Sequence, residues 1–303
     1  MNILLTLNKT YRNQMDGGYW NVYLPLLELG HNVYWYDTVN PKEKDYKKII
    51  KAFKPDLIFS CMTGDPHITP YEPWDEIIEE TNSGRTKTFN WFCDDTWRFD
   101  SFSSKVCASF NVCSTPEPSY IQKYKDIGYN NILLGCWHIN KDTYPNTLFE
   151  EKNIDLLFMG NPTSSRRQFL RIAEKNNISI TNIYGVSHEE MLEYYSKSRI
   201  GINLSINDND PERKTQMKQR MFEVPAGRGL LLTQHHEALE HFYEIDKEII
   251  TFKTYDEFVK KTSFLLKNPK FVNKIATNGY NRFLKQHESK VRLKNVLEKI
   301  VKC

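Results

Sequence analysis

The sequence lacks the long apolar runs and the short signature motifs that mark several classes of protein. No apolar run approaches the ~18 residues of a membrane-spanning helix. The N-terminus has no basic region before its apolar stretch and no small-residue cleavage site, so we expect no signal peptide. There is also no GxGxxG, Walker A loop, HExxH or zinc-ligand spacing. The missing dinucleotide fingerprint argues against a simple NAD-dependent enzyme, and we expect no resident cofactor.

Cysteines are few and follow no regular pattern. None of them forms a CxxC pair, and their spacing shows no disulfide framework. Such thiols are typical of a reducing compartment, so we expect reduced cysteines and a cytoplasmic location. The six are Cys61, Cys93, Cys107, Cys113, Cys136 and Cys303.

The remaining composition is that of an ordinary globular protein. Of 303 residues, 40% are hydrophobic and 26% charged, which excludes a disordered, collagenous or coiled-coil chain and suggests roughly two domains. The net charge of +3 hides an asymmetry, because residues 1–150 hold 15 Lys and Arg against 19 Asp and Glu, whereas residues 151–303 hold 26 against 19. The basic second half suits an anionic ligand such as a nucleotide or a nucleic acid, although a chance excess of solvated lysines explains the counts equally well.

Short apolar runs alternate with amphipathic segments along the first half of the chain. The runs predict buried parallel strands, and the alternation predicts a doubly wound α/β sheet. Strands are expected at Ile3–Leu7, Val33–Tyr36, Leu57–Ser60, Thr88–Phe92, Phe110–Cys113 and Ile132–Leu134, and helices at Trp20–Leu29, Lys42–Phe53, Trp74–Glu80 and Pro116–Ile127.

A segment without periodicity, residues 135–153, is predicted to be a linker, after which the pattern restarts. We therefore expect two Rossmann-like domains, 1–150 and 151–303, with a cleft between them and a helical C-terminal tail. In the second half, strands are expected at Ile154–Met159, Ile178–Tyr184, Ile200–Ser205, Leu230–Thr233 and Glu248–Phe252, and helices at Arg166–Lys175, His188–Ser196, Gln216–Ala226, Tyr255–Leu266, Phe271–Gln286 and Lys290–Val301.

Ligands of such sheets bind at the carboxyl ends of the strands, so the loops there are the candidate sites. The segment Met159–Arg167 follows a predicted strand, and Gly160 allows a tight turn. Ser164 or Ser165 can cap a helix that begins with two arginines. A helix N-terminus beside arginines can bind a phosphate, although a capped helix with solvated arginines explains the same residues.

Two further segments carry charged residues in suggestive positions. In Lys214–Thr233, Lys218 and Arg220 can neutralise a diphosphate, and Glu223 can accept the hydroxyls of a ribose; a structural helix with a surface ion pair is the alternative.

In Asn90–Asp100, Asp94 and Asp95 follow a predicted strand, and one of these adjacent carboxylates can serve as a base. Trp91 and Trp97 can stack on a sugar ring. An N-capping aspartate with core tryptophans is the alternative.

The second half resembles the CgeB-like, spore-maturation type of glycosyltransferase, which has the two-Rossmann GT-B fold. The similarity runs through FMGN…RR at Phe158–Arg167, SRIGINLS at Ser198–Ser205, QMKQRMFEVPAGRGLLLT at Gln216–Thr233, IYG at Ile183–Gly185 and a tail pattern from Lys267 to Arg292. The first half is similar chiefly through FNWFCDDTWRFDSFS at 89–103. The resemblance implies transfer of a sugar from a UDP-, GDP- or other nucleotide-linked donor without a bound metal.

The resemblance also implies roles for individual residues. Glu223 matches the ribose position, and Tyr184 and Gly185 fall where the base edge is expected. Two departures concern Thr215, where retaining relatives often carry a second Glu, and Arg228-Gly229, where the family usually has paired glycines. Donor contacts are expected from Gly160, Asn161, Arg166, Arg167, Tyr184, Gly185, Lys218, Arg220 and Glu223, and acceptor contacts from Gly17, Gly18, Trp91 and Trp97.

In the expected reaction, Asp95 or Asp94 removes a proton from the acceptor hydroxyl. We favour Asp95, because in a strand continued past Phe92 it shares a face with Trp91. His67 and His138 are next in line as bases. Asp208 and Asp210 form a D-x-D in the polar loop 207–213, which we interpret as a flexible segment rather than a metal site.

Two other functions remain open from the residues alone. One is transfer to a modified DNA base, for which the enzyme would flip the base into the cleft and bind the phosphate backbone with its basic half. The other is non-catalytic binding of a nucleotide or carbohydrate. The oligomeric state is not indicated by the sequence.

Overall fold

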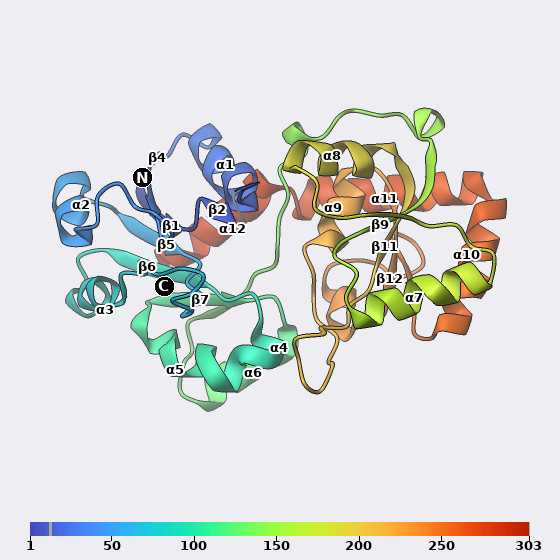
Figure 1. Cartoon of the computed structure of the whole chain (residues 1–303). Helices are drawn as coiled ribbons and strands as arrows, with labels where there is room; N and C mark the ends of the chain where they lie inside the picture. Colours follow the sequence, from blue (N-terminus) through green and yellow to red (C-terminus); the bar gives the residue numbers. More distant parts are fainter. Residues whose placement is uncertain (12–13, 303) are drawn as a thin grey trace. The chain divides into compact units, whose positions relative to one another are not determined.

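The apolar runs form two separate parallel sheets, and each sheet lies at the centre of its own structural unit (Figure 1). The computed structural model describes residues 1–11 and 14–302; Cys303, expected to be a reduced thiol, lies outside them. The first unit comprises Met1–Cys136 and Ser289–Cys303, and the second comprises Trp137–Glu288. Within the described residues, no helix has both the length and the apolarity to span a membrane.

The first unit contains a six-stranded parallel sheet in the order β4-β1-β5-β6-β7-β8, as a doubly wound pattern predicts. The strands are β1 (Asn2–Leu7), β4 (Asn32–Asp37), β5 (Leu57–Ser60), β6 (Lys87–Trp91), β7 (Val112–Thr115) and β8 (Ile132–Leu134). The helices are α1 (Leu24–Glu28), α2 (Tyr46–Phe53), α3 (Trp74–Ser83), α4 (Asp95–Arg98), α5 (Ser104–Val106) and α6 (Pro118–Asp126), with π-helical turns at Tyr19–Tyr23 and Phe99–Ser103 and a 3₁₀ turn at Cys107–Ser109.

The second unit contains a five-stranded parallel sheet in the order β10-β9-β11-β12-β13. Its strands are β9 (Ile154–Met159), β10 (Thr181–Ile183), β11 (Ser198–Asn203), β12 (Leu230–Gln234) and β13 (Ile250–Phe252). Its helices are α7 (Ser164–Lys175), α8 (His188–Lys197), α9 (Arg220–Ala226), α10 (Tyr255–Lys267) and α11 (Pro269–Gln286), with 3₁₀ turns at Lys141–Thr143, Phe149–Glu151 and Glu237–His241.

The division of the chain differs from the expected boundary at residue 150. The last helix, α12 (Ser289–Lys302), belongs to the first unit, because its Leu293, Leu297 and Ile300 are buried in the core around Ile3 of β1. The periodicity of a helix shows that one face is apolar, but it does not show which sheet that face covers.

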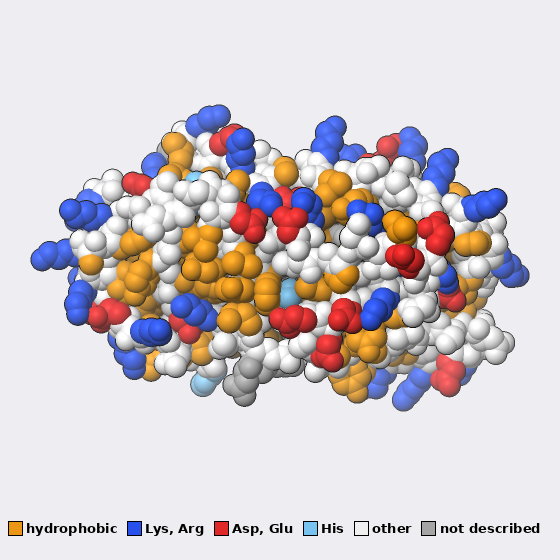
Figure 2. Space-filling model, turned by 90° about the horizontal axis from the view of Figure 1, so that it is seen from above, with side chains coloured by type: hydrophobic (Ala, Val, Ile, Leu, Met, Phe, Trp, Pro, Cys, Tyr) orange, Lys and Arg blue, Asp and Glu red, His pale blue; other side chains and the backbone are white. Residues whose placement is uncertain are grey.

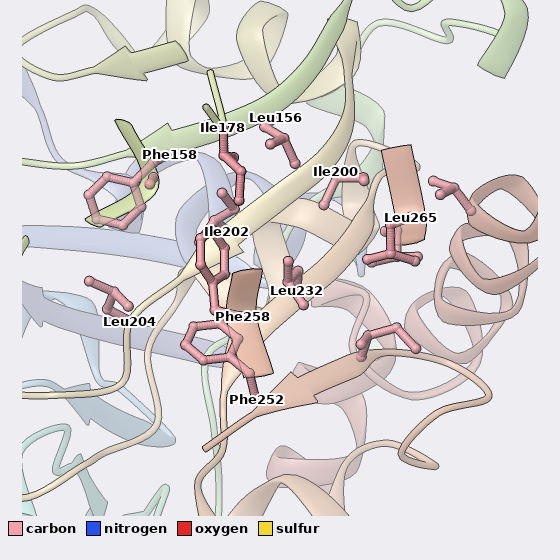
Figure 3. Close-up of a cluster of buried hydrophobic side chains, with 14 of the residues drawn as sticks. Leu156, Phe158, Ile178, Ile200, Ile202, Leu204, Leu232, Phe252, Phe258 and Leu265 are labelled. Atoms are coloured by element: carbon pink, nitrogen blue, oxygen red, sulfur yellow. The ribbon is translucent and has the colours of Figure 1, made fainter. Parts of the chain in front are cut away.

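The core of the second unit combines strand residues with residues of α7, α10 and α11, and Figure 3 shows part of this cluster. Phe158 of β9, Ile202 of β11 and Leu232 of β12 are fully buried, and Phe252 and Phe258 close the cluster from β13 and α10. This apolar layer holds the strands in register, so that their polar carboxyl ends form one edge of the sheet.

Several elements differ from their expected bounds. The segment expected as a single helix over Trp20–Leu29 is a π-helical turn, Tyr19–Tyr23, followed by α1, which has Pro25 in its first turn. The strand expected over Ile178–Tyr184 contracts to β10, and the helix expected from Gln216 begins at Arg220. A short hairpin, β2 (Thr10–Tyr11) with β3 (Gln14–Met15), was not expected.

Candidate functional site

The strand order of the second unit creates a topological switch point between β9 and β11. The chain leaves β9 toward β10 on one side and then crosses to β11 on the other side of β9. Loops that leave neighbouring strands in opposite directions open a crevice at the carboxyl ends of those strands. Gly160 directly follows β9, and Asn203 is the last residue of β11. The candidate site is built around these two residues.

Gly160 brings two arginine side chains close to the backbone. Its φ is +148°, and a Cβ atom at this position would lie 2.8 Å from Nη2 of Arg220 and 3.1 Å from Nη1 of Arg166. Residues with a side chain rarely adopt this backbone conformation, and the space that a Cβ would need is already filled by the guanidinium groups. Glycine is therefore required here for both a conformational and a steric reason.

Arg220 is held in place from two directions. Its Nη1 donates to Oδ1 of Asn203 over 3.0 Å, and its guanidinium carbon lies 5.4 Å from the ring centre of Phe158. Its Nε is buried and has no hydrogen-bond partner among the described residues. A buried donor without a partner costs free energy, so this atom is a candidate to contact a ligand.

Arg166 lies beside Arg220 and is held by the loop that precedes its helix. Its Nη1 donates to the carbonyl of Asn161 over 2.8 Å. Burial, together with repulsion by Arg220, lowers the pKa of Arg166 to about 10. In the part of the chain that the structure describes, neither guanidinium forms an ion pair. Two neighbouring cations without a carboxylate partner favour an anionic ligand.

Glu223 lies one helical turn after Arg220 and is almost fully buried, with 7% of its surface exposed. Its Oε2 accepts a hydrogen bond from the Tyr195 hydroxyl over 2.9 Å. Burial raises the pKa of Glu223, whereas the charge of Arg220 and hydrogen bonds from Tyr195 and Gln219 oppose that rise. The carboxyl group is thus oriented by neighbours on both sides.

Helix α9 is short because a proline interrupts it. Pro225 lies inside the helix and has no N–H to donate to the carbonyl of Met221. The Tyr243 hydroxyl donates to that carbonyl instead, over 2.9 Å. The replacement bond anchors the first turn of α9, which carries both Arg220 and Glu223.

The N-terminus of α7 was predicted to be a phosphate site, but an aspartate of this chain occupies it. Ser165 donates its hydroxyl to Oδ1 of Asp208, and Arg213 donates to the same oxygen over 3.2 Å. Hydrogen bonds from Ser165 and Thr163 more than offset desolvation and lower the pKa of Asp208. The expected serine cap is absent, since Thr163 is the N-cap residue and makes no capping bond.

The D-x-D sequence is consequently part of a structured loop. Asp210 is buried, and its Oδ1 accepts from the backbone N–H of Glu212 over 2.9 Å. The loop closes on itself through the bond from the N–H of Asn207 to the carbonyl of Lys214. Both aspartates of the D-x-D thus have hydrogen-bond partners within the chain. Among the described residues, no group of three or more His, Cys, Asp and Glu side chains could hold a metal ion.

The other predicted donor residues belong to the same unit. Arg167 is exposed and donates to the carbonyl of Pro162. Tyr184 is 54% exposed after β10, and Gly185 follows it with a φ of +72° and open space at its Cβ position. Lys218 is half-buried just before α9. The structure brings Gly160, Arg166 and Arg220 into contact, with Asn161 bound to Arg166 and Glu223 within the electrostatic reach of Arg220.

The expected orientation of Asp94 and Asp95 is wrong. Strand β6 ends at Trp91 and α4 begins at Asp95, so the strand alternation that favoured Asp95 does not continue. Asp95 has no exposed surface, and the Tyr124 hydroxyl donates to its two oxygens over 3.1 and 3.0 Å. In this structure no acceptor can contact Asp95.

Asp94 differs from Asp95 in each of these respects. It is half-buried and occupies the N-cap position of α4, but its side chain makes no capping hydrogen bond. Asp94 therefore has a carboxylate that can face a substrate.

The predicted acceptor residues lie on different elements of the first unit: Trp91 ends β6, Trp97 is in α4, and Gly17 and Gly18 are in a helical turn. Trp97 is 37% exposed, whereas Trp91 is half-buried. Gly18 follows β3 and has a packing role, because a Cβ there would lie 2.4 Å from Cδ2 of Leu7. Gly17 lies beside it, and Asp16 accepts a hydrogen bond from the N–H of Gly18 over 2.8 Å.

The two histidines proposed as reserve bases belong to different units. His67 is exposed on the loop after β5 of the first unit. His138 is buried and belongs to the second unit, so the expectation that it lies on a loop of the first domain is wrong.

Sequence reasoning missed Asn203 and Tyr195. Asn203 donates to the hydroxyl of Thr233 over 2.9 Å and accepts from Arg220, so it links β11, β12 and α9. Its signal was a polar residue at the carboxyl end of an apolar run. Tyr195 offered no such signal, because its contact with Glu223 depends on how α8 packs against α9.

Comparison with known families gives a match over most of the second unit and the first part of α12. Residues 149–298 match the model of a family described as glycosyl transferase-like. This match includes the whole cluster around Gly160, Arg220 and Glu223. This part of the chain is therefore similar to glycosyl transferase-like proteins. No curated protein sequence matches the chain significantly.

Solved structures share the fold over the full chain at low sequence identity. A glycosyltransferase from Rickettsia africae is 12% identical with a TM-score of 0.66, covering 99% of this chain and 98% of that one. Sucrose-phosphate synthase from Thermosynechococcus elongatus is 10% identical with a TM-score of 0.64, covering 99% of both chains. Anabaena HepE in complex with UDP and glucose is 9% identical with a TM-score of 0.67, covering 99% and 100%. The fold is that of GT-B glycosyltransferases, with two α/β sheet units, and confirms the expected fold class.

Proposed function

We propose that this protein is a glycosyltransferase that moves a sugar from a nucleotide-diphosphate donor to an acceptor hydroxyl, and that its second unit binds the donor. The observation that carries the proposal is the pair of half-buried guanidinium groups of Arg166 and Arg220, which lie beside Gly160 at the switch point and form no ion pair among the described residues. The family match covers this cluster, and the fold is that of enzymes that use such donors. The sequence motifs further support a place in the CgeB-like group.

The two arginines bind the diphosphate in this proposal. A guanidinium group can donate two parallel hydrogen bonds to phosphate oxygens, and the buried Nε of Arg220 supplies one such donor without breaking a bond to Asn203. When the sugar is transferred, negative charge develops on the departing diphosphate. The two cations stabilise this charge at positions fixed before the reaction, which is the task that a metal ion performs in other transferases. The reaction should therefore proceed without a bound metal.

Glu223 holds the ribose of the donor. Its Oε2 is already bound by Tyr195, and this bond orients the carboxylate. Oε1 then accepts a ribose hydroxyl in place of the Gln219 side chain, which also donates to this group. We assign the nucleobase to Tyr184 and Gly185, which are exposed and follow the neighbouring strand β10. UDP is the first nucleotide to test, because HepE was solved with UDP and with UDP-glucose.

The proton of the acceptor hydroxyl passes to Asp94 in this proposal. As the hydroxyl oxygen attacks the anomeric carbon, the bond between this carbon and the diphosphate oxygen breaks, and the carboxylate takes the proton. We assign the base to Asp94 and not to Asp95, because only Asp94 has exposed surface. The side chain of Asp94 also makes no capping hydrogen bond that would hold it on α4.

The decisive experiment measures nucleotide binding by calorimetry on the full chain with UDP, GDP and the free nucleosides. Arg166→Ala should weaken binding of the preferred diphosphate by about tenfold or more, because a charge-assisted hydrogen bond is lost. Arg171→Ala is the matched control, since Arg171 is exposed on the same helix, α7. Failure of every nucleoside diphosphate to bind, or equal effects of the two substitutions, would overturn the assignment.

A second measurement separates an enzyme from a binding protein. The purified chain should slowly hydrolyse the sugar donor that it binds and should transfer the sugar when an acceptor is supplied. Both rates should persist in excess chelator. Binding without any release of sugar would favour a non-catalytic role, and loss of activity restored by manganese would contradict metal independence.

A further inference from the structure

The first unit contains a cavity that none of the predicted site residues line. It has a volume of about 590 Å³ and lies along the edge strand β4. Its walls come from Lys9 on the loop after β1, from the π-helical turn Tyr19–Tyr23, from β4 and from residues 40–43. Seen from above, hydrophobic side chains gather on the surface of this unit with charged side chains around them (Figure 2). A volume of this size is in the range of ligand-binding pockets.

Three aromatic rings form one wall of the cavity. The rings of Tyr19 and Trp35 are nearly parallel, with an angle of 17° and a centre-to-centre distance of 6.2 Å. Tyr23 lies 5.0 Å from Trp35. The indole N–H of Trp35 donates to the carbonyl of Leu7 over 2.8 Å, which fixes the ring. All three rings are half-buried, so part of each is accessible to a ligand.

The carboxylate of Asp37 and the amine of Lys9 also line this cavity. Oδ1 of Asp37 accepts from the backbone N–H groups of Lys9 and Val39 over 3.0 and 3.1 Å. In the described part of the chain, Oδ2 of Asp37 has no hydrogen-bond partner. The amine of Lys9 lies 5.4 Å from the ring centre of Trp35. The cavity therefore offers a fixed acceptor and a flexible donor next to an apolar face.

From this arrangement we propose that the cavity binds a neutral pyranose, as one sugar unit of a glycan. A pyranose ring presents C–H groups on its faces, which pack on aromatic rings, and hydroxyls around its rim, which both donate and accept hydrogen bonds. Asp37 Oδ2 accepts from two neighbouring hydroxyls, and Lys9 donates to a third. A quaternary ammonium ligand is disfavoured because Lys9 would repel it, and a phosphate is disfavoured because Asp37 would repel it.

This site is separate from the proposed donor site. It lies wholly within the first unit and includes none of the arginines that bind the diphosphate. The inference extends the proposed function by adding a second sugar-binding position. This position would hold a glycan through one of its own sugar units, and not through the sugar of the donor. Its existence does not depend on whether the second unit binds UDP.

The test uses the full chain and a panel of neutral sugars: glucose, galactose, mannose, N-acetylglucosamine and short oligomers of each. Saturation-transfer NMR should show contact with the C–H protons of at least one sugar, and calorimetry gives its affinity. Asp37→Asn keeps an oxygen for the two backbone bonds and removes the charge, so it should weaken binding by about tenfold. Asp100→Asn is the control, since Asp100 is an exposed aspartate of the same unit.

Two further measurements test whether the aromatic wall binds the sugar and whether this site is independent of the donor site. Tyr19→Ala should also weaken sugar binding, and circular dichroism establishes that this variant is folded. Saturating UDP should leave sugar binding unchanged, and Arg220→Ala should do the same. The proposal is overturned if no neutral sugar binds, if Asp37→Asn and Tyr19→Ala bind sugar as well as the parent chain does, or if UDP displaces the sugar. Loss of UDP binding with retained sugar binding would contradict only the donor assignment.

Discussion

Gly160 and Arg220 are mutually dependent, because a Cβ at position 160 would lie 2.8 Å from Nη2 of Arg220. Arg220 cannot move away freely, since its Nη1 is bound to Asn203 at the end of β11. The glycine after β9 and the arginine of α9, separated by sixty residues of sequence, therefore define one ligand position at the switch point of the sheet.

Gly160→Ala is expected to weaken binding of nucleoside diphosphate by about tenfold, because the new methyl group displaces a guanidinium that donates a charge-assisted hydrogen bond. Calorimetry with UDP measures the effect. Gly84→Ala is a suitable control, since Gly84 also has a positive φ, +65°, but has open space around its Cβ position in the first unit. The control should lose stability without losing UDP affinity, and equal affinities for the two variants would count against the dependence.

Glu223→Gln should remove the preference for ribose over deoxyribose. If Glu223 accepts a ribose hydroxyl, the parent chain binds UDP more tightly than 2′-deoxy-UDP by about tenfold. The variant should bind the two ligands equally, because the charged acceptor is lost. Tyr195→Phe should reduce the preference to a smaller extent, since Tyr195 only orients the carboxylate. A parent chain without any preference would refute the ribose assignment.

Asp208→Asn tests whether a carboxylate of this chain competes with phosphate. Asp208 accepts from Ser165 at the N-terminus of α7, where an anionic ligand would otherwise bind. Removing its charge should increase UDP affinity by about threefold to tenfold at low ionic strength. Asp210→Asn, in the same loop, should not increase it. An unchanged affinity in both variants would mean that the diphosphate does not use this helix end.

Asp94→Asn should lower turnover by about 10²–10⁴ while leaving donor affinity unchanged, because removing a general base slows only the proton transfer. Steady-state rates and calorimetry measure the two quantities. Asp95→Asn is the neighbouring control and should retain most of the turnover, since its carboxylate is enclosed by Tyr124 and other protein groups. The opposite pattern would restore Asp95 as the base and would require the enclosing segment to open.

The stability of the first unit should depend on Asp95 between about pH 4 and 6. Burial raises the pKa of Asp95 from 3.8 to about 6. In this window the folded chain binds more protons than the unfolded chain, so the contribution of Asp95 to stability is greatest at low pH and falls as the pH rises through 6. Asp95→Asn removes this contribution. The difference in unfolding free energy between the variant and the parent chain should move in favour of the variant by about 1–3 kcal/mol from pH 4 to 7, measured by urea titration.

A constant difference across this range would mean that Asp95 does not titrate there. Comparing the variant with the parent chain is essential, because burial lowers the pKa of His188 to about 4, and this shift gives a slope of the opposite sign over much of the same range.

The elements of the fold were largely predictable, because burial on both faces leaves parallel strands as short apolar runs. Ile154–Met159 and Ile132–Leu134 have the predicted bounds. Most helices are near their expected positions, but Pro25 and the π-helical turn divide the first one, and α2 and α9 each begin four residues later than expected. The type and position of each strand and helix depend mainly on residues that are close in the sequence, so the sequence alone is enough to predict them.

The family resemblance and the loop positions predicted a set of donor-binding residues. This set includes Gly160, Arg166, Arg220 and Glu223, which the structure brings together. The sequence by itself determined the α/β class, the loops that carry the charged residues and the need for glycine after β9. Tertiary structure alone decided that α12 covers the first sheet, that Asp208 occupies the helix end expected for phosphate, and that Asp95 is enclosed while Asp94 is open. Each of these three features depends on contacts between segments far apart in the chain. The packing of the elements decides which groups a side chain contacts there, and the periodicity of the local sequence does not.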